Sequence, residues 1–334
     1  MRGARFVDPG ALARIRNLEL LARTVVDGFI NGLHRAPHLG FSLDFAEHRG
    51  YEPGDDLRRV DWRVFARTDR YYVKQFEADS NANLVVALDV SSSMRYASRG
   101  VTKLDYGRFL AASLLYFSHR QRDRVGLVTF DTEIREYVPP SARHLEFGLY
   151  ALDRVADGRP GALAPPMLRL TERLVRRGII VVISDFYDEP EAIAQAVRPL
   201  RYRGHDVIVC HVLDPAETDF PFTEAASCED LETGDRMPIV PASVREQYQA
   251  LVRQHTEALG RLFTDSRIDY ALFNTSVPLD HALFHYLSAR ERLSRARGCR
   301  SWRPRCSPPC SPSRFRSWCT SCSASAARPR RSRR

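Results

Sequence analysis

Three oxygen-bearing side chains directly follow an apolar run near the first third of the chain. Residues 84–88 are all apolar, Asp89 comes next, and Ser91 and Ser93 follow at every second position. Alternate residues in a tight loop can turn their side chains toward one point. A carboxylate and two hydroxyls are the hard oxygen ligands that suit Mg²⁺ or a similar ion. The spacing therefore predicts a divalent-cation site made by Asp89, Ser91 and Ser93.

A second acidic residue ends another apolar run. The segment GIIVVISD places Asp185 after the strand-like residues 179–183. In an open parallel sheet, ligands bind beyond the carboxyl ends of the strands, near the point where the strand order reverses, so we expect Asp185 to join the metal site. The competing interpretation is that Asp89, Ser91 and Ser93 only cap the turn and satisfy backbone amides, as such residues commonly do.

The elements that must position these residues alternate regularly from residue 83 onward. Strand-like apolar runs occupy residues 84–88, 125–130, 179–183, 207–213 and 268–273. Helical patterns occupy residues 104–119, 144–155, 167–176, 192–200 and 244–263. Nearly all-apolar strands between amphipathic helices are typical of parallel strands buried on both faces. The sequence therefore predicts an α/β fold with a doubly wound, mostly parallel sheet, interrupted by a hairpin at Gly234-Asp235.

Composition divides the chain into four parts. Residues 1–32 contain a single amphipathic helix, residues 33–82 are dense in charge, aromatics and turn formers, and residues 83–297 carry the alternating elements. We expect the second part to be a small, ion-paired, β-rich substructure, because charges of both signs alternate in GDDLRRVDWR. Residues 298–334 form an arginine-rich and cysteine-rich tail.

The tail accounts for the basic character of the chain. Removing its ten arginines takes the net charge from +9 to −1, so the charge gives no reason to expect a nucleic-acid partner. Its CSPPC and CTSC pairs have zinc-ligand spacing, but a segment without apolar periodicity cannot form the hairpins that carry such sites. With suitable synonymous codons, the nucleotides that encode this tail would encode an apolar, membrane-helix-like segment when read one frame earlier. We infer that residues 298–334 are a frameshifted, disordered reading of a downstream gene.

The sequence lacks the signals that are typical of secreted, membrane-spanning and disulfide-rich proteins. The chain has no signal-peptide pattern and no apolar run long enough to span a membrane, so we expect a cytoplasmic protein without direct membrane insertion. Only Cys210 and Cys228 lie outside the tail, which argues against a disulfide framework in the core.

The motif DVSSSM resembles the DxSxS signature of the von Willebrand factor A fold. In that fold the metal-ion-dependent adhesion site (MIDAS) takes an aspartate and two serines after the first strand and another aspartate from a later strand. The resemblance assigns these roles to Asp89, Ser91, Ser93 and Asp185. The usual site threonine has no counterpart in the segment DGRPGALAPP, which contains neither Thr nor Ser.

The block YEPGDDLRRVDWRVFARTDRYYVKQFE resembles the diagnostic stretch of the bacterial domain-of-unknown-function family fifty-eight. The later segment DYALFNTSVPLDHALFHYL also resembles the end of that family. Members are often associated with MoxR-type AAA+ ATPases and with membrane-anchored proteins bearing A-type domains. The resemblance therefore implies a non-enzymatic, Mg²⁺-assisted protein-interaction module that acts with such partners in assembling or activating protein complexes.

The alternative is a phosphoryl-transfer or hydrolytic enzyme with Asp89 as its nucleophile. Common phosphatases of that kind place a second carboxylate two residues further on for acid-base chemistry, and here that position is Ser91. No Walker P-loop, GxGxxG or GxSxG motif follows a strand. The sequence favours the interaction module.

Overall fold

The structure is a computed structural model. It describes residues 17–34, 48–50, 67, 71–74, 82–155, 159–224, 226–231 and 234–283. All of these residues belong to one compact unit, Met1–Ala289. The predicted tail at 298–334 and most of the predicted substructure at 33–82 lie outside the described residues.

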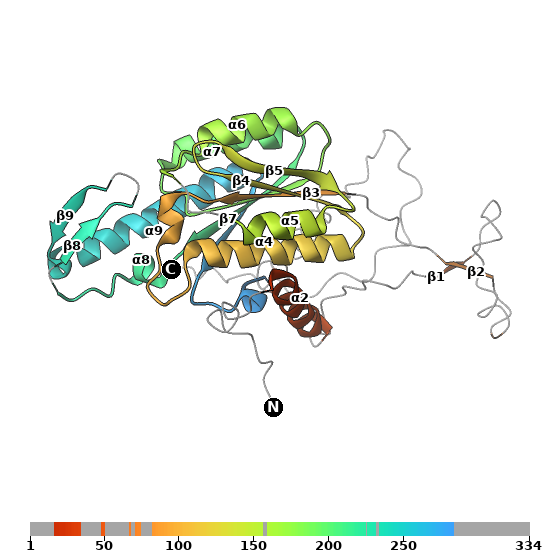
Figure 1. The fold of residues 1–334 in the computed structure, drawn as a ribbon, viewed down its shortest axis with the longest axis horizontal. Coiled ribbons are helices and arrows are strands. Elements are labelled where there is room, and N and C mark those ends of the chain that lie inside the picture. Colours follow the sequence, from red (N-terminus) through yellow and green to blue (C-terminus); the bar gives the residue numbers. More distant parts are fainter. Residues whose placement is uncertain are drawn as a thin grey trace, which may run out of the picture. The chain divides into compact units, whose positions relative to one another are not determined.

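A six-stranded sheet with the order β10-β7-β6-β3-β4-β5 occupies the centre of this unit (Figure 1). Its strands are β3 (Asn83–Asp89), β4 (Arg124–Phe130), β5 (Ile134–Ser141), β6 (Ile179–Ser184), β7 (Asp206–Leu213) and β10 (Asp269–Asn274). Every pairing in this sheet is parallel except that of β4 with β5. The predicted α/β class with a mostly parallel sheet is confirmed.

Helices cover both faces of the sheet (Figure 1). On one face lie α4 (Lys103–Arg120) and α5 (Leu145–Asp153), and α2 (Leu18–His34) packs against α4. On the other face lie α6 (Ala164–Arg173), α7 (Pro190–Tyr202) and α9 (Pro241–Asp265). Because successive strand side chains point to opposite faces, Val86 and Leu88 enter the first core and Val85 and Ala87 the second. None of the helices in the described ranges has the length and apolar character needed to cross a membrane.

The strand order reverses between β3 and β6. The chain leaves β3 into α4 on one face of the sheet and leaves β6 into α7 on the other. The two connections therefore diverge above the carboxyl ends of these neighbouring strands, which is where ligands bind in open α/β sheets. This is the edge at which the sequence places Asp89 and Asp185.

Some elements differ from their predictions. Strand β5 is not predicted, because it is an antiparallel edge strand with only partial burial and contains Pro139 and Pro140. Helix α6 begins three residues before its predicted start, since Pro165 and Pro166 are tolerated in a first helical turn. The predicted hairpin is confirmed by the antiparallel pair β8 (Ala226–Glu229) and β9 (Arg236–Ile239).

Smaller described elements complete the unit. The short strands β1 (His48–Gly50) and β2 (Tyr72–Lys74) pair antiparallel within the predicted β-rich substructure. A 3₁₀ turn, η2 (Ser92–Arg95), follows β3, and α8 (Pro215–Asp219) follows β7. Both of these lie after the carboxyl ends of their strands, on the side of the candidate site.

Truncation of the central strand tests the packing of the first core. Leu88 is fully buried. A Cβ added to Gly107 of α4 would lie only 2.9 Å from the Cδ1 atom of Leu88, so α4 packs tightly on the Leu88 side chain. Leu88→Ala is expected to lower the free energy of unfolding by about 2–5 kcal/mol, because the cavity cannot fully collapse. Leu272→Ala, on edge strand β10 and half exposed, should change it by about 0.5 kcal/mol or less. Urea unfolding of both variants measures the difference, and equal losses would contradict the packing.

Candidate functional site

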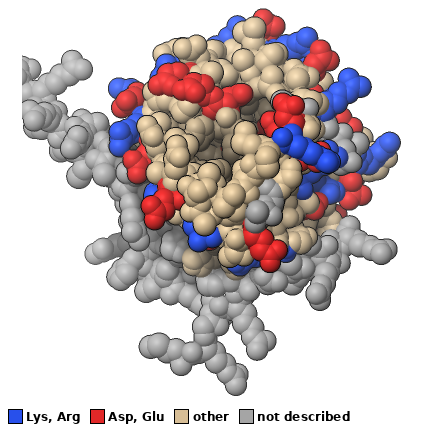
Figure 2. Space-filling view, turned by 90° about the vertical axis from the view of Figure 1, so that its left-hand side faces the viewer, with Lys and Arg blue, Asp and Glu red and all other residues tan. Residues whose placement is uncertain are grey.

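A pocket of about 80 Å³ opens at the carboxyl edge of the sheet. All four sequence-predicted ligand residues line it, namely Asp89, Ser91, Ser93 and Asp185. The remaining walls come from the segment Gly161-Ala162-Leu163 and from the turn that follows β6. Figure 2 faces the side of the molecule at which β8 and β9 lie, and shows a hollow among mainly uncharged residues with acidic side chains gathered above it. The structure therefore brings the predicted residues together, while their binding of a metal stays a prediction.

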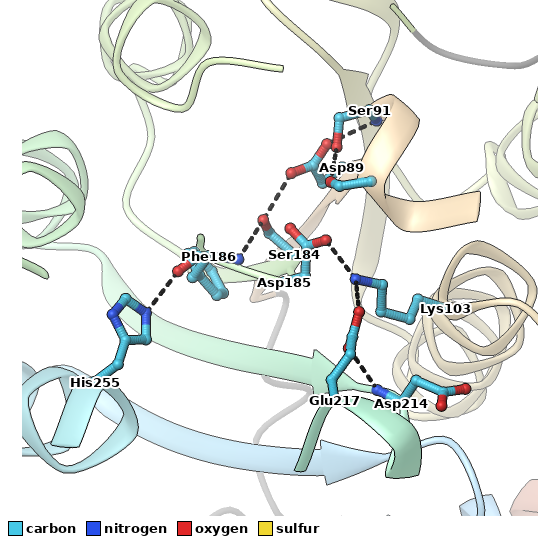
Figure 3. Close-up of polar contacts among 10 residues, drawn as sticks. Asp89, Ser91, Lys103, Ser184, Asp185, Phe186, Asp214, Glu217 and His255 are labelled. Atoms are coloured by element: carbon cyan, nitrogen blue, oxygen red, sulfur yellow. Dashed lines mark hydrogen bonds and ion pairs between the residues drawn. The ribbon is translucent and has the colours of Figure 1, made fainter. Parts of the chain in front are cut away.

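The Asp89 carboxylate is held by two hydrogen bonds (Figure 3). The backbone N–H of Ser91 donates to Oδ1 at 2.9 Å, and the hydroxyl of Ser184 donates to Oδ2 at 2.6 Å. The Ser91 and Ser93 hydroxyl oxygens lie 3.1 Å apart. Asp89 thus caps the turn, as the competing interpretation expects. The hydroxyls of Ser91 and Ser93 also lie side by side at the pocket, as the metal-site prediction expects.

The loop before α6 lies directly against Ser91. The Ser92 amide donates to the Arg159 carbonyl at 3.2 Å, and a Cβ on Gly161 would lie 2.7 Å from the Ser91 Cβ. Only glycine fits at this approach. This loop belongs to the segment in which the resemblance expects a threonine, and its described lining residues, Gly161 to Leu163, offer no side-chain oxygen.

The charge of Asp89 has no cationic neighbour in the part of the chain that the structure describes: no ammonium, guanidinium or imidazole nitrogen lies within 4 Å of its carboxylate. Burial, and next the nearby charge of Asp185, raise the pKa of Asp89 to about 7, although the bonds from Ser184 and Ser91 act in the opposite direction. The pocket is therefore a place where added positive charge would be stabilised.

Asp185 has a different environment, because its charge is matched inside the protein. The Lys103 ammonium lies 2.7 Å from Asp185 Oδ2 and 2.8 Å from Glu217 Oε1 (Figure 3). The Lys103 side chain is fully buried and also sits over the Tyr187 ring, 4.6 Å from its centroid. Burial alone lowers the pKa of Lys103, but the two carboxylates raise it above its ordinary value, so the group stays charged.

The turn after β6 is held in an uncommon conformation. Phe186 has a φ of 47°, in the left-handed region that costs a bulky residue about 1–3 kcal/mol. Its N–H donates to the Ser184 hydroxyl at 3.2 Å, and its carbonyl accepts a bond from His255 Nε2 at 2.8 Å. These contacts fix the direction in which Asp185 and Tyr187 leave the turn.

Sequence reasoning missed three residues of this site: Ser184, Lys103 and Glu217. Lys103 carries a recognisable signal, because it is the first residue of α4 after the N-cap Thr102, where the helix dipole disfavours a cation. A lysine there needs an anionic partner. Glu217 is the third helical residue of a capping box that begins at Asp214, whose amide donates to Glu217 Oε2 at 2.8 Å.

The oxygen set suits a hard cation. Within the described ranges, no group of three or more His, Cys, Asp or Glu side chains is arranged to hold a metal ion. A site made by one carboxylate and two serine hydroxyls does not need such a group. The arrangement at Asp89 therefore disfavours zinc and is compatible with Mg²⁺ or Mn²⁺.

Comparison with known proteins identifies the family. The profile described as "Protein of unknown function DUF58" matches residues 47–258. The uncharacterized protein Rv1480 of Mycobacterium tuberculosis (strain ATCC 25618 / H37Rv) is 31% identical over 236 residues, which cover 68% of this chain and 73% of that protein. The chain belongs to the DUF58 family. The predicted family is confirmed, and the match includes the first of the two sequence blocks.

This DUF58 protein is also similar to two solved structures. One is the conserved hypothetical protein BatB from Bacteroides thetaiotaomicron, with a TM-score of 0.41 and 18% identity, covering 63% of this chain and 99% of that one. The other is an aerotolerance-related membrane protein from Bacteroides fragilis NCTC 9343, with a TM-score of 0.43 and 15% identity, covering 64% and 99%.

Removal of the buried ammonium tests the ion triad. Lys103→Met leaves Asp185 and Glu217 without their cation and is expected to lower the free energy of unfolding by about 3–5 kcal/mol. The variant Lys103→Met/Asp185→Asn/Glu217→Gln, which removes all three charges, should recover much of that loss. Denaturant unfolding at neutral pH measures both. A Lys103→Met protein as stable as the wild type would show that the triad does not hold this edge.

The pH dependence of stability tests the environment of Asp89. Its pKa rises from an ordinary value of 3.8 to about 7 in the folded protein, so the folded state binds the proton more tightly than the unfolded chain does. This contribution is fully present below about pH 4 and is lost as the pH rises through about 7. In metal-free buffer, the wild type should therefore lose thermal stability relative to Asp89→Asn across that interval. A constant difference between the two melting midpoints would contradict the raised pKa.

Proposed function

We propose that this protein is a non-enzymatic interaction module whose pocket at the carboxyl edge binds a divalent cation and, with it, a carboxylate of a partner protein. One observation carries the proposal. Asp89 is a buried carboxylate beside two adjacent hydroxyls in an open pocket, and no described cation lies against it. Such a site is incomplete without a positive charge from outside the chain.

The residues present fit Mg²⁺. Adjacent ligands around octahedral Mg²⁺ are about 2.8–3.0 Å apart, given ligand distances of about 2.0–2.1 Å. The hydroxyl oxygens of Ser91 and Ser93 lie 3.1 Å apart, close to that separation. When bound, the ion would supply a compact positive charge that offsets Asp89 and accepts oxygen ligands.

The four residues of the predicted metal set have two different roles in this proposal. Asp185 lies at the end of the neighbouring strand β6, and its Oδ2 already accepts a hydrogen bond from the Lys103 ammonium. Asp89, Ser91 and Ser93 are therefore the residues that we assign to direct contact with the ion. Asp185 adds negative charge beside them, as its effect on the pKa of Asp89 indicates.

The rim of the pocket suits contact with another protein. Tyr187 lines the pocket and is 53% exposed, and the neighbouring Asp188 is also exposed. A carboxylate from a partner would replace water at the ion and add a charge that the ion can use. From the family resemblance, we propose a MoxR-type AAA+ ATPase and membrane-anchored A-domain proteins as partners. We propose that the protein binds them in the cytoplasm.

The enzyme alternative has less support from the geometry. The groups that hydrogen-bond to the Asp89 carboxylate are the hydroxyl of Ser184 and the amide and hydroxyl of Ser91, and none of them is an acid-base group suited to phosphoryl transfer. The nearby acid Asp185 is paired with Lys103. The interaction module is therefore the better interpretation of this pocket.

Metal titration tests the proposal directly. Calorimetry with Mg²⁺ and Mn²⁺ should show binding to the wild type and about tenfold or more weaker binding to Ser91→Ala/Ser93→Ala and to Asp89→Ala. Ser92→Ala is the matched control, because Ser92 lies between the two serines and does not line the pocket. Identical isotherms for all four proteins would remove the metal from the proposal.

The partner is tested by recovery of a MoxR-type ATPase from the same organism on the immobilised protein. By linkage, Mg²⁺ must strengthen partner binding by the factor by which the partner strengthens Mg²⁺ binding. Recovery should therefore fall with EDTA and with the double serine variant. Equal recovery in every condition would contradict the docking role, and hydrolysis of a phosphate ester that Asp89→Asn abolishes would favour the enzyme.

A further inference from the structure

A second pocket, of about 230 Å³, lies at the opposite edge of the sheet. Its lining includes Asn83 and Ile179, which are the first residues of β3 and β6, and Arg124, the first residue of β4. The pocket is thus at the amino ends of strands whose carboxyl ends carry the Asp89 site. It is separate from the pocket to which the proposed function belongs.

The charged residues of this pocket all have one sign. Arg124, Arg173 and Arg176 line it, and no Asp or Glu does. In the described part of the chain, no carboxylate lies within 4 Å of these three guanidinium groups, whereas Arg169 on the same helix as Arg173 pairs with Glu133 at 3.6 Å. The Arg173 guanidinium instead lies over the Tyr137 ring, 5.2 Å from its centroid. Three like charges around one hollow favour the binding of an anion.

The rest of the lining is largely apolar, with one unsatisfied polar atom. Val85, Leu174 and Ile180 form part of the wall. His205 also lines the pocket, is 2% exposed, and has an Nδ1 without a hydrogen-bond partner among the described residues. Burial lowers the pKa of His205, so the positive charge comes from the arginines and the imidazole is a neutral hydrogen-bonding group.

We propose that this pocket binds a small organic phosphate, with the phosphate on the arginines and an apolar body against the wall. Guanidinium groups bind phosphate and carboxylate through paired hydrogen bonds, and three of them favour a doubly charged head group over a carboxylate. The volume suits a small molecule rather than an extended chain. This proposal does not depend on cation binding at Asp89.

Fluorine NMR with 4-fluorophenyl phosphate as the probe tests this site. The wild type should broaden the probe signal, and excess inorganic phosphate should reverse the broadening. Arg173→Gln/Arg176→Gln should weaken binding about tenfold or more. The control Arg169→Gln/Arg261→Gln removes the same charge from two exposed arginines that pair with glutamates, and should weaken binding less than about twofold.

A second pair of variants keeps the arginines in place. Val175 lines the pocket and is 87% exposed, so its replacement should not disturb folding. Val175→Glu adds a carboxylate that competes for the arginines and should weaken binding, while Val175→Gln should not. The proposal is overturned if the wild type leaves the probe unbroadened at millimolar concentration, if 4-fluorobenzyl alcohol binds equally well, or if the arginine variants bind like the control. Equal or tighter binding of 4-fluorobenzoate would overturn the assignment of phosphate.

Discussion

The buried ion triad of Lys103, Asp185 and Glu217 is the constraint on which the candidate site depends. It joins the start of α4, the turn after β6 and the helix α8, three elements that converge at the carboxyl edge of the sheet. Removing Lys103 would leave two uncompensated carboxylates away from water, so the shared ammonium holds the three elements in one arrangement. The strained turn at Phe186 lies next to Asp185 and is held by the Ser184 hydroxyl and by His255.

The triad also makes the two strand-end aspartates unequal. Asp185 is matched by an internal ammonium, whereas Asp89 is buried beside hydroxyls and keeps a raised pKa. The protein thus pairs one carboxylate with an internal cation and leaves the other without one among the described residues. This asymmetry, rather than the number of acidic residues, gives the pocket its affinity for a cation in our proposal.

The two pockets share their supporting strands. Strand β3 begins at Asn83, beside the arginine-lined pocket, and ends at Asp89, in the pocket at the carboxyl edge of the sheet. Its residues between these ends are buried in the two cores on either face of the sheet. A closely packed core has few alternative arrangements, so both pockets are built on a rigid part of the molecule.

Local patterns in the sequence were sufficient to predict the parallel strands, the helices between them, and the approach of Asp89, Ser91, Ser93 and Asp185. Buried strands are continuous apolar runs, and strand ends in a parallel sheet share one edge, so neither inference needs long-range information. The edge strand β5 was missed because its burial is partial and it contains two prolines. Only the tertiary structure decided the partners of Lys103, which are 82 and 114 residues away in the chain, and the gathering of Arg124, Arg173 and Arg176 at one pocket. Contacts between residues so far apart depend on how the helices pack on the sheet, and periodicity within a segment carries no record of that packing.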